Sequence, residues 1–354
     1  MNSGYYHFTK EQRSNAIQRL TALWAFTESG LGGILHALQI PFTGLLVGGM
    51  AVIMICLIAE FSEQKYKQIL KAALIVLIVK AMAAPFTPVT AYIAVSFQAL
   101  LGFTLFSLLR VNYISIVLLS TVAMLESAIQ KLLVLTLFFG ESIWRAMDKM
   151  VAFASTQLGN AVLNGSNWIV GIYLFIYFIG GFVIAWLAYS TLKNFNTANP
   201  VFILKESSAN NMNLKLSNAP DKKKSYKKLC LLLLVMIILS VILFFFSADK
   251  NQGWVEVLKT ITWTISALLI WFLLIGPLIT KAIQKLLKKK QIRYIDEIAM
   301  TLSFLPVLKK LTALAWQQSK LLSGFKRLHF FFKVLIYSTL TYTEPDSDKN
   351  NIPQ

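Results

Sequence analysis

The sequence has few charged residues, histidines and cysteines. Only 14% of its 354 residues are Asp, Glu, Lys or Arg, and it has 3 His and 2 Cys. Soluble domains carry about 25% charged residues, so the composition excludes a soluble globular protein. Cys56 and Cys230 both lie inside apolar runs. The sequence therefore has neither a disulfide framework nor a CxxC metal motif.

The sequence contains long apolar runs. Hydrophobic residues make up 56% of the chain, and residues 168–192 and 229–246 contain no charged residue at all. A helix of about 20 apolar residues crosses the roughly 30 Å of hydrocarbon in a bilayer. The pattern predicts an all-α integral membrane protein with several spans.

The order of the apolar runs predicts a modular chain. Six spanning helices are expected in a membrane unit over residues 1–193, at 21–39, 41–59, 69–84, 89–109, 113–139 and 168–192, with a weaker amphipathic stretch at 141–158. A basic cytoplasmic linker (194–228) and a transmembrane hairpin (229–280) are expected next, followed by cytoplasmic amphipathic helices (281–342) and a disordered tail (343–354).

Basic residues outnumber acidic ones, 34 against 16, which gives a formal net charge of +18. Beside membrane spans such a surplus indicates cytoplasmic loops that face anionic headgroups. We therefore expect both termini in the cytoplasm and contact with anionic lipid, and no binding to nucleic acid.

One stripe of the first apolar segment is almost free of side chains. Ser29, Gly33 and Ala37 are spaced four residues apart, and small residues at this spacing let helices approach closely in lipid. The stripe predicts either packing inside the six-helix unit or a docking face for a second membrane unit.

Polar and ionisable side chains inside apolar segments are functional candidates by default, because burying them in lipid is costly. The charge-based topology places most of them toward the outer side, where they would form a solute pocket. The candidates are His36, Gln39, Lys80, Thr87, Thr90, Tyr92, Gln98, Glu126, Lys131, Asn167 and Trp168.

A plainer explanation stays open for the same residues. Glu126 and Gln130 lie one helical turn apart and would then satisfy each other or Lys80, while Lys131 would extend its amine toward the headgroups. Glu28 lies near the cytoplasmic end of its helix, where a structural role is expected.

Motifs for catalysis are missing from the sequence. It has no Gly-rich phosphate loop with Lys-Ser/Thr, no HExxH and no Asp-rich magnesium pair. His36 has no second ligand at metal-binding spacing. We expect no enzyme activity, no cofactor and no metal site.

Two regions resemble the membrane subunits of energy-coupling factor importers. The run Pro85-Phe86-Thr87-Pro88-Val89-Thr90-Ala91-Tyr92-Ile93-Ala94 resembles part of a solute-binding S component. Residues 296–306, Asp-Glu-Ile-Ala-Met-Thr-Leu-Ser-Phe-Leu-Pro, are similar to the acidic residue, apolar helix and Leu-Pro turn before the coupling helices of a T component. The Ala-Arg-Gly ends of those helices are absent.

The resemblance implies an S-component-like unit fused to a partial T-component-like unit. Such a chain would bind a small, vitamin-like solute from outside the bacterial cytoplasmic membrane and couple to a separate ABC-type ATPase pair that hydrolyses ATP. The coupling residues it implies are Arg293, Glu297, Pro306, Gln317 and Lys320. A membrane scaffold without transport activity and a transferase acting on a lipid are the alternatives.

Overall fold

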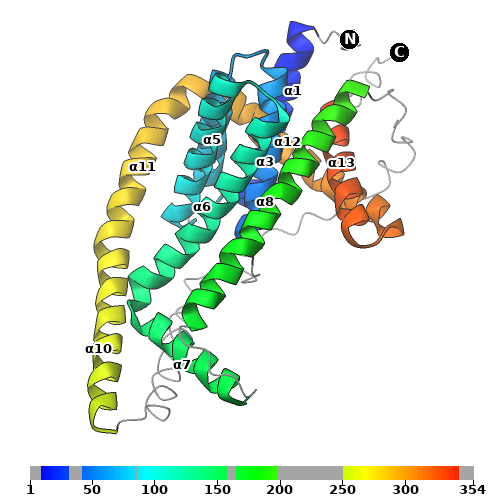
Figure 1. Ribbon diagram of the computed structural model, residues 1–354. Helices are drawn as coiled ribbons and strands as arrows, with labels where there is room; N and C mark the ends of the chain where they lie inside the picture. The colour runs from blue at the N-terminus through cyan, green and yellow to red at the C-terminus, as the bar shows by residue number, and fades with distance from the viewer. Residues whose placement is uncertain (1–8, 32–41, 85–86, 158–164, 198–249, 343–354) are drawn as a thin grey trace, which may run out of the picture. The chain divides into compact units, whose positions relative to one another are not determined.

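A computed structural model describes residues 9–31, 42–84, 87–157, 165–197 and 250–342 (Figure 1). Every regular element in these ranges is helical, which confirms the all-α class. The N-terminal elements are α1 (Lys10–Phe26), η1 (Thr27–Leu31), α3 (Thr43–Phe61), α4 (Lys67–Ala83), α5 (Val89–Leu109), α6 (Tyr113–Phe139), α7 (Ser142–Gln157) and α8 (Gly165–Thr197). The C-terminal elements are α10 (Lys250–Leu269), η3 (Ile270–Ile275), α11 (Gly276–Gln291), η4 (Ile292–Tyr294), α12 (Ile295–Gln318), η5 (Ser319–Leu321) and α13 (Gly324–Thr341).

Five helical segments of the described chain are long and apolar enough to cross a membrane, as in a multi-pass membrane protein. They are Thr43–Phe61, Val89–Leu109, Tyr113–Phe139, Gly165–Lys193 and Gly276–Leu321. The first four agree with expected spans. The fifth differs: it is one long helical segment that includes α11 and α12, most of which was expected to lie at the cytoplasmic interface. The first arm of the expected hairpin lies outside the described residues.

Helix α1 begins much earlier than expected. The sequence suggested a helix from residue 21, but α1 starts at Lys10, where Thr9 and Gln12 form a capping box: each side chain bonds the backbone of the other residue. This cap satisfies amide groups that the helix start leaves unpaired. The first turns of α1 are polar, so the apolar run that predicted the helix did not include them.

The C-terminal segment also departs from expectation. Elements α10, η3 and α11 follow one another without a loop, and η4 joins α11 to α12. The expected Leu-Pro turn does not form: α12 continues through Pro306. A proline inside a helix removes one backbone hydrogen bond, and here the helix continues across that gap.

The helices form two compact units that do not follow chain order. The first comprises Met1–Ile129, Leu174–Asn199 and Ile279–Gln354, and the second comprises Gln130–Tyr173 and Pro200–Leu278. Within the first unit, α12 and α13 therefore belong with α1, α3, α4 and α5, whereas the sequence suggested consecutive modules. Composition marks changes along a chain, and it carries no information on which distant segments pack together.

Helix α3 forms the core of the first unit, and glycines allow its neighbours to approach it. Gly49 lies against Ile184 of α8, and Ile55 lies against Gly102 of α5. A further close contact joins Gly181 of α8 to the backbone of Thr121 in α6. Small residues at helix contacts are a main source of association in lipid. Among the described residues, these close contacts centre on α3 and α8.

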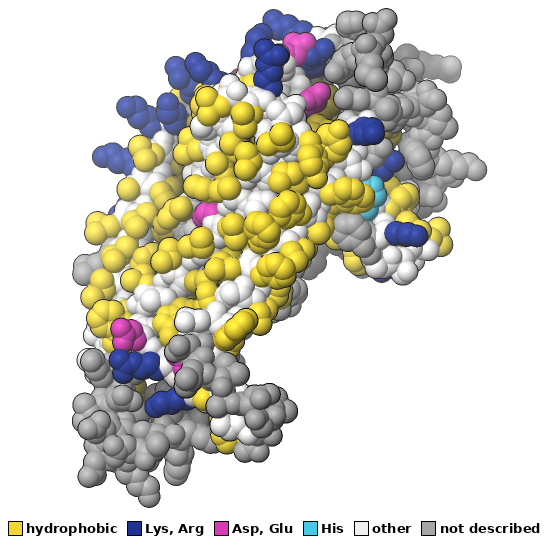
Figure 2. Space-filling view, in the orientation of Figure 1, with side chains coloured by type: hydrophobic (Ala, Val, Ile, Leu, Met, Phe, Trp, Pro, Cys, Tyr) yellow, Lys and Arg dark blue, Asp and Glu magenta, His cyan; other side chains and the backbone are white. Residues whose placement is uncertain are grey.

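The outward faces of α6 and α8 are apolar. Exposed side chains include Ile114, Leu118, Phe175, Phe182 and Trp186, and Figure 2 shows hydrophobic side chains over much of its centre, with most Lys and Arg toward its edges. Exposed apolar area of this extent is typical of a surface that faces lipid or a partner.

The second unit is held together by contacts around α7, the amphipathic stretch expected from the sequence. The Asp148 carboxylate accepts a hydrogen bond from the backbone N–H of Ser166 at 2.7 Å, at the start of α8. The Trp144 indole N–H donates to the Thr136 hydroxyl of α6 at 3.1 Å. Phe138 and Trp271 meet edge to face. The first contact joins α7 to α8, the second spans the turn between α6 and α7, and the third joins α6 to η3.

The close contact at Gly181 gives a stability prediction. A Cβ added at Gly181 would lie 2.7 Å from the Thr121 Cα, a backbone atom that cannot rotate away. We expect Gly181→Ala to destabilise the protein by about 1–3 kcal/mol through overpacking. Gly171→Ala on the same helix is the control, because nothing lies within 4 Å of its added Cβ. Thermal unfolding in detergent should separate the two variants; equal melting temperatures would contradict the packing.

Candidate functional site

A carboxylate and an ammonium group meet inside the first unit. The Lys80 Nζ donates to Glu28 Oε2 at 2.5 Å, and their side chains are only 4% and 5% exposed. Glu28 belongs to η1, and Lys80 lies in the last turns of α4. Removing two charges from water is expensive, and only a close, well-formed pair repays much of that cost. The pair therefore ties the end of α1 to the end of α4.

The position of Glu28 depends on an irregular turn. Residues Thr27–Leu31 form a π-helix directly after α1, and such turns often occur at functional sites in helices. The Ser29 hydroxyl donates to the carbonyl of Ala25 within this region. Ser29 is thus placed beside the ion pair, while Gly33 and Ala37 of the proposed docking stripe lie outside the described residues.

A second polar cluster lies along the glycine face of α3. The side-chain amide nitrogen of Gln98 lies 3.0 Å from the position that a Cβ on Gly48 would occupy, and Ser127 Oγ lies 3.6 Å from it. Gln98 is only 2% exposed, and its Oε1 has no hydrogen-bond partner in the described part of the chain. Oε2 of Glu126, next to Ser127 on α6, is also buried and without such a partner. Two unsatisfied acceptors in apolar surroundings are expensive.

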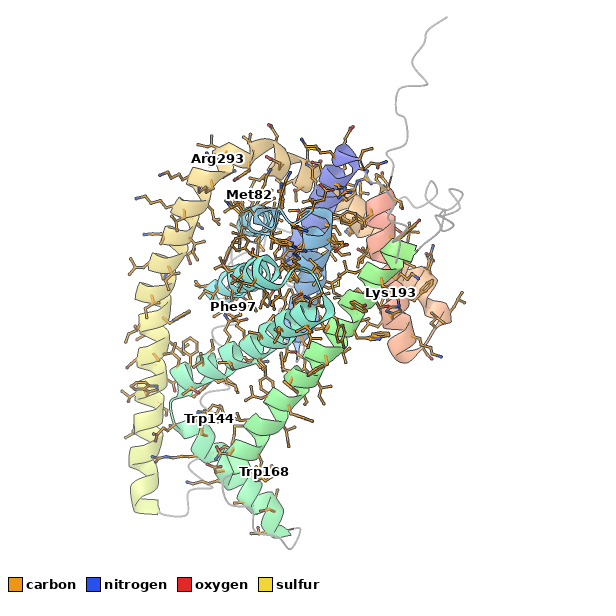
Figure 3. All side chains as sticks on the ribbon, turned by 45° about the horizontal axis from the view of Figure 1, so that its top comes forward. Met82, Phe97, Trp144, Trp168, Lys193 and Arg293 are labelled. Atoms are coloured by element: carbon orange, nitrogen blue, oxygen red, sulfur yellow. The ribbon has the colours of Figure 1, made fainter. Side chains whose placement is uncertain are left out.

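The remaining solute-binding candidates are divided between the two units. Tyr92 is buried, Thr87 donates to the Ala84 carbonyl, and Thr90 is half-buried. Three candidates belong to the second unit and are exposed: Lys131, Asn167 and Trp168, the last of which is labelled in Figure 3. His36 and Gln39 lie outside the described residues.

Lys80 was expected to face a solute or to be satisfied by Glu126, and Glu28 was expected to have a separate structural role. The structure pairs Lys80 with Glu28 instead. The sequence could not reveal this pairing, because the two residues are 52 positions apart. Their only signal was that each is an isolated charge of opposite sign in an apolar segment.

Helix α12 is joined by polar contacts to the bundle that α1, α3, α4 and α5 form in the first unit. The Lys71 Nζ of α4 bonds Glu297 Oε1 at 2.7 Å, and the Gln18 side-chain amide of α1 lies 3.0 Å from the Met300 sulfur. Among the coupling candidates, Glu297 forms a polar bond to α4 within the described part of the chain. Arg293, at the bend seen in Figure 3, is exposed, as are Pro306, Gln317 and Lys320.

Helix α13 is attached to the same unit. The Arg19 guanidinium of α1 donates to the Leu340 carbonyl at 2.7 Å, and the His329 ring lies 5.2 Å from the Trp186 ring of α8. Burial lowers the pKa of His329, and the nearby Lys333 lowers it further. The imidazole is therefore neutral at neutral pH, and its contact with Trp186 joins two uncharged rings.

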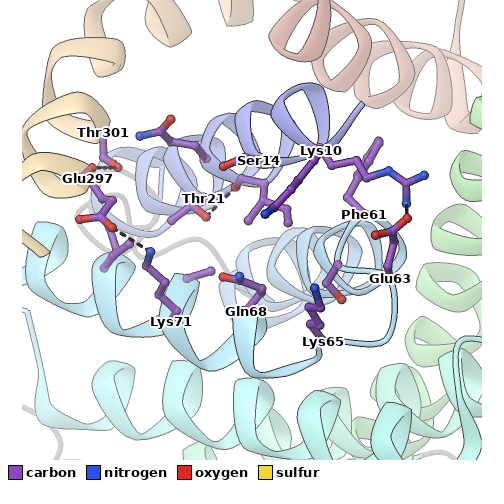
Figure 4. A pocket seen from close by; sticks show the side chains of 16 residues that line it. Lys10, Ser14, Thr21, Phe61, Glu63, Lys65, Gln68, Lys71, Glu297 and Thr301 are labelled. Atoms are coloured by element: carbon purple, nitrogen blue, oxygen red, sulfur yellow. Dashed lines mark hydrogen bonds and ion pairs between the residues drawn. The ribbon is translucent and has the colours of Figure 1, made fainter. Parts of the chain in front are cut away.

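The sequence analysis missed a polar cavity of about 270 Å³ (Figure 4). It lies between α1, the α3–α4 loop, α4 and α12, and the Lys71–Glu297 pair forms part of its wall. Basic and hydroxyl or amide side chains dominate its lining: Lys10, Arg13, Lys65, Lys71, Ser14, Gln18, Gln68, Thr21, Ser62 and Thr301. None of the expected solute-binding residues lines it.

Comparison with known proteins gives no relative: no family model, no curated protein and no solved structure matches the chain.

The buried ion pair gives a second stability prediction. Lys80→Met should leave the Glu28 carboxylate buried without its cation and should destabilise the protein by about 3–5 kcal/mol. The double variant Glu28→Leu/Lys80→Met removes both charges and should recover most of that loss, because apolar replacements of a buried pair are often neutral or stabilising. Thermal unfolding in detergent measures both variants; additive losses in the double variant would contradict the pairing.

Proposed function

We propose that the chain is the membrane component of an ATP-driven importer of the energy-coupling factor type. In this proposal it lies in the bacterial cytoplasmic membrane with both termini inside, and the bundle binds a small solute from the outer side. A separate ATPase pair acts on the C-terminal helices. The chain itself carries out no catalysis.

The observation that carries this proposal is the polar joint between α12 and the bundle, by which we mean the Lys71–Glu297 and Gln18–Met300 contacts. A coupling helix must be attached to the unit that it moves, since a free amphipathic helix would transmit no force. Glu297 contacts α4 and Met300 contacts α1. The same two helices are tied together by the Glu28–Lys80 pair. A tilt of α12 would therefore act on α1 and α4 together, in the manner of rigid-body domain movements.

The solute would contact the polar cluster around Gln98. Its unsatisfied amide oxygen is an acceptor that a bound solute with a donor group would satisfy. Gly44 and Gly48 let Ser127 and Gln98 approach α3 closely, so that polar side chains line this face of the helix. Lys80 is not needed for this role, because Glu28 already neutralises it.

A scaffold without transport activity is the second candidate. The Glu28–Lys80 pair favours it, because one of the charges expected to hold a solute is satisfied by the protein itself. A scaffold would need neither a bound solute nor an ATPase.

The coupling proposal predicts that the full-length chain, purified from native membranes, retains an ABC-type ATPase pair that hydrolyses ATP. Glu297→Gln removes the ion pair with Lys71 and so weakens the joint. The stimulation of the ATP hydrolysis rate by the membrane component should then fall about two- to fivefold, as expected for the loss of one partly exposed ion pair. Asp296→Asn is the matched control, because this neighbouring carboxylate is exposed and outside the joint. Absence of any ATPase from the purified chain would favour the scaffold.

The solute proposal predicts a small molecule that copurifies with the chain and is seen by native mass spectrometry. Gln98→Leu should reduce its occupancy at least tenfold, because a site built to hydrogen-bond a ligand loses much affinity when a partner is removed. Ser96→Ala on the same helix is the control, since its hydroxyl bonds only the Tyr92 carbonyl among the described contacts. An unchanged ligand in Gln98→Leu would contradict the site.

A further inference from the structure

The cavity beside α12 has a surplus of positive charge that its own acids do not neutralise. Its two carboxylates, Glu63 and Glu297, are bound to Arg13 and Lys71 respectively. Lys10 and Lys65 also line it, and neither takes part in an ion pair within the described chain. We propose that this cavity binds a phosphate group, carried by an anionic lipid headgroup or by a free phosphate compound.

The two remaining lysines come from separate elements and point toward each other. Lys10 opens α1 and Lys65 lies in the loop between α3 and α4, and Figure 4 shows their amines on opposite sides of the cavity. Two ammonium groups that face one space repel each other, and an anion between them removes that repulsion. Lysine is a common phosphate ligand because its ammonium acts as a compact point charge.

Neutral donors complete the lining. Ser14 carries a hydroxyl and Gln68 carries an amide, and both extend from the helices on either side. Lys10 also stands in the first turn of α1, where the aligned peptide groups give partial positive charge. Phosphate oxygens accept several hydrogen bonds at once, so a mixture of ammonium, hydroxyl and amide donors suits them.

The loop that supplies Lys65 is held in an unusual conformation. Glu63 and Gln64 have φ angles of 48° and 68°, in the left-handed region that residues other than glycine seldom adopt. Strain of this kind concentrates at binding and switch regions. The two residues turn the chain at the end of α3 so that Lys65 reaches the cavity.

The size of the cavity limits the ligand. A volume of about 270 Å³ is just below the range of about 300–1,000 Å³ typical of drug-sized ligands. A phosphate with a few attached atoms, such as a glycerophosphate headgroup or a pyrophosphate, is of the right scale. With both termini in the cytoplasm, as proposed above, this cavity would lie on the cytoplasmic side, where both anionic headgroups and free phosphate compounds occur.

The test uses the full-length chain in nanodiscs of zwitterionic lipid. One arm adds phosphatidylglycerol to the disc and counts retained lipid by native mass spectrometry. The other arm titrates pyrophosphate and follows binding by calorimetry. Lys10→Gln/Lys65→Gln removes both free amines, and Lys288→Gln/Lys289→Gln in α11 is the control with the same loss of charge on exposed lysines outside the cavity.

We expect about tenfold weaker binding in the Lys10/Lys65 variant and little change in the control. Binding in the lipid arm alone identifies a headgroup, and binding in the pyrophosphate arm identifies a free phosphate compound. Equal weakening in both variants would overturn the proposal, because it would show general attraction to basic surface. Failure of the unaltered chain to bind in either arm would overturn it as well. The copurification of an ATPase pair, which tests the proposed function, does not depend on these binding results, so the two proposals can fail separately.

Discussion

A carboxylate and an ammonium group buried together in an apolar bundle form the contact on which the rest of the first unit depends. Either charge alone would cost several kcal/mol in such surroundings, so Glu28 and Lys80 must stay close to each other. This requirement fixes the end of α1, through its π-helical turn, against the end of α4. Because α1 and α4 are also the helices that α12 contacts, the pair sets the surface on which the C-terminal segment rests.

The glycine contacts and the polar joint have complementary roles around this pair. Gly49 and Gly102 let apolar side chains of neighbouring helices approach closely, which gives an apolar core, whereas Gly48 faces Gln98 and Ser127. The contacts of α12 are polar instead, through Glu297 and Met300. Such partly exposed polar contacts are weaker and more easily exchanged than a packed glycine interface. A joint of this kind suits a helix that must remain attached while it moves.

Much of the fold could be predicted from the sequence, because apolar runs longer than 18 residues have few alternatives to spanning helices. The bounds of α5 and α6 agree with the expected ones. The start of α1 was missed because its signal is a capping box rather than hydrophobicity. The continuation through Pro306 was missed because a proline marks a probable break and does not require one.

The candidate site was less predictable than the fold. Gln98 and Glu126 could be singled out as polar groups in apolar helices, and the structure buries atoms of both. The partner of Lys80 and the basic cavity depend on contacts between segments far apart in the chain, such as Lys71 with Glu297, 226 positions later. Local patterns carry no information on such pairings, and no related protein supplied it.

The most direct test of the account is disulfide crosslinking between α1 and α12 in native membranes. Cysteines placed at Gln18 and Met300, whose side chains meet at 3.0 Å, in a chain with Cys56 and Cys230 replaced by alanine, should crosslink rapidly and almost completely. The account predicts that the crosslink forms in the whole chain and that ATP changes its rate when the ATPase pair is present. Absence of the crosslink under oxidising conditions would show that α12 is not joined to the bundle and would contradict the account.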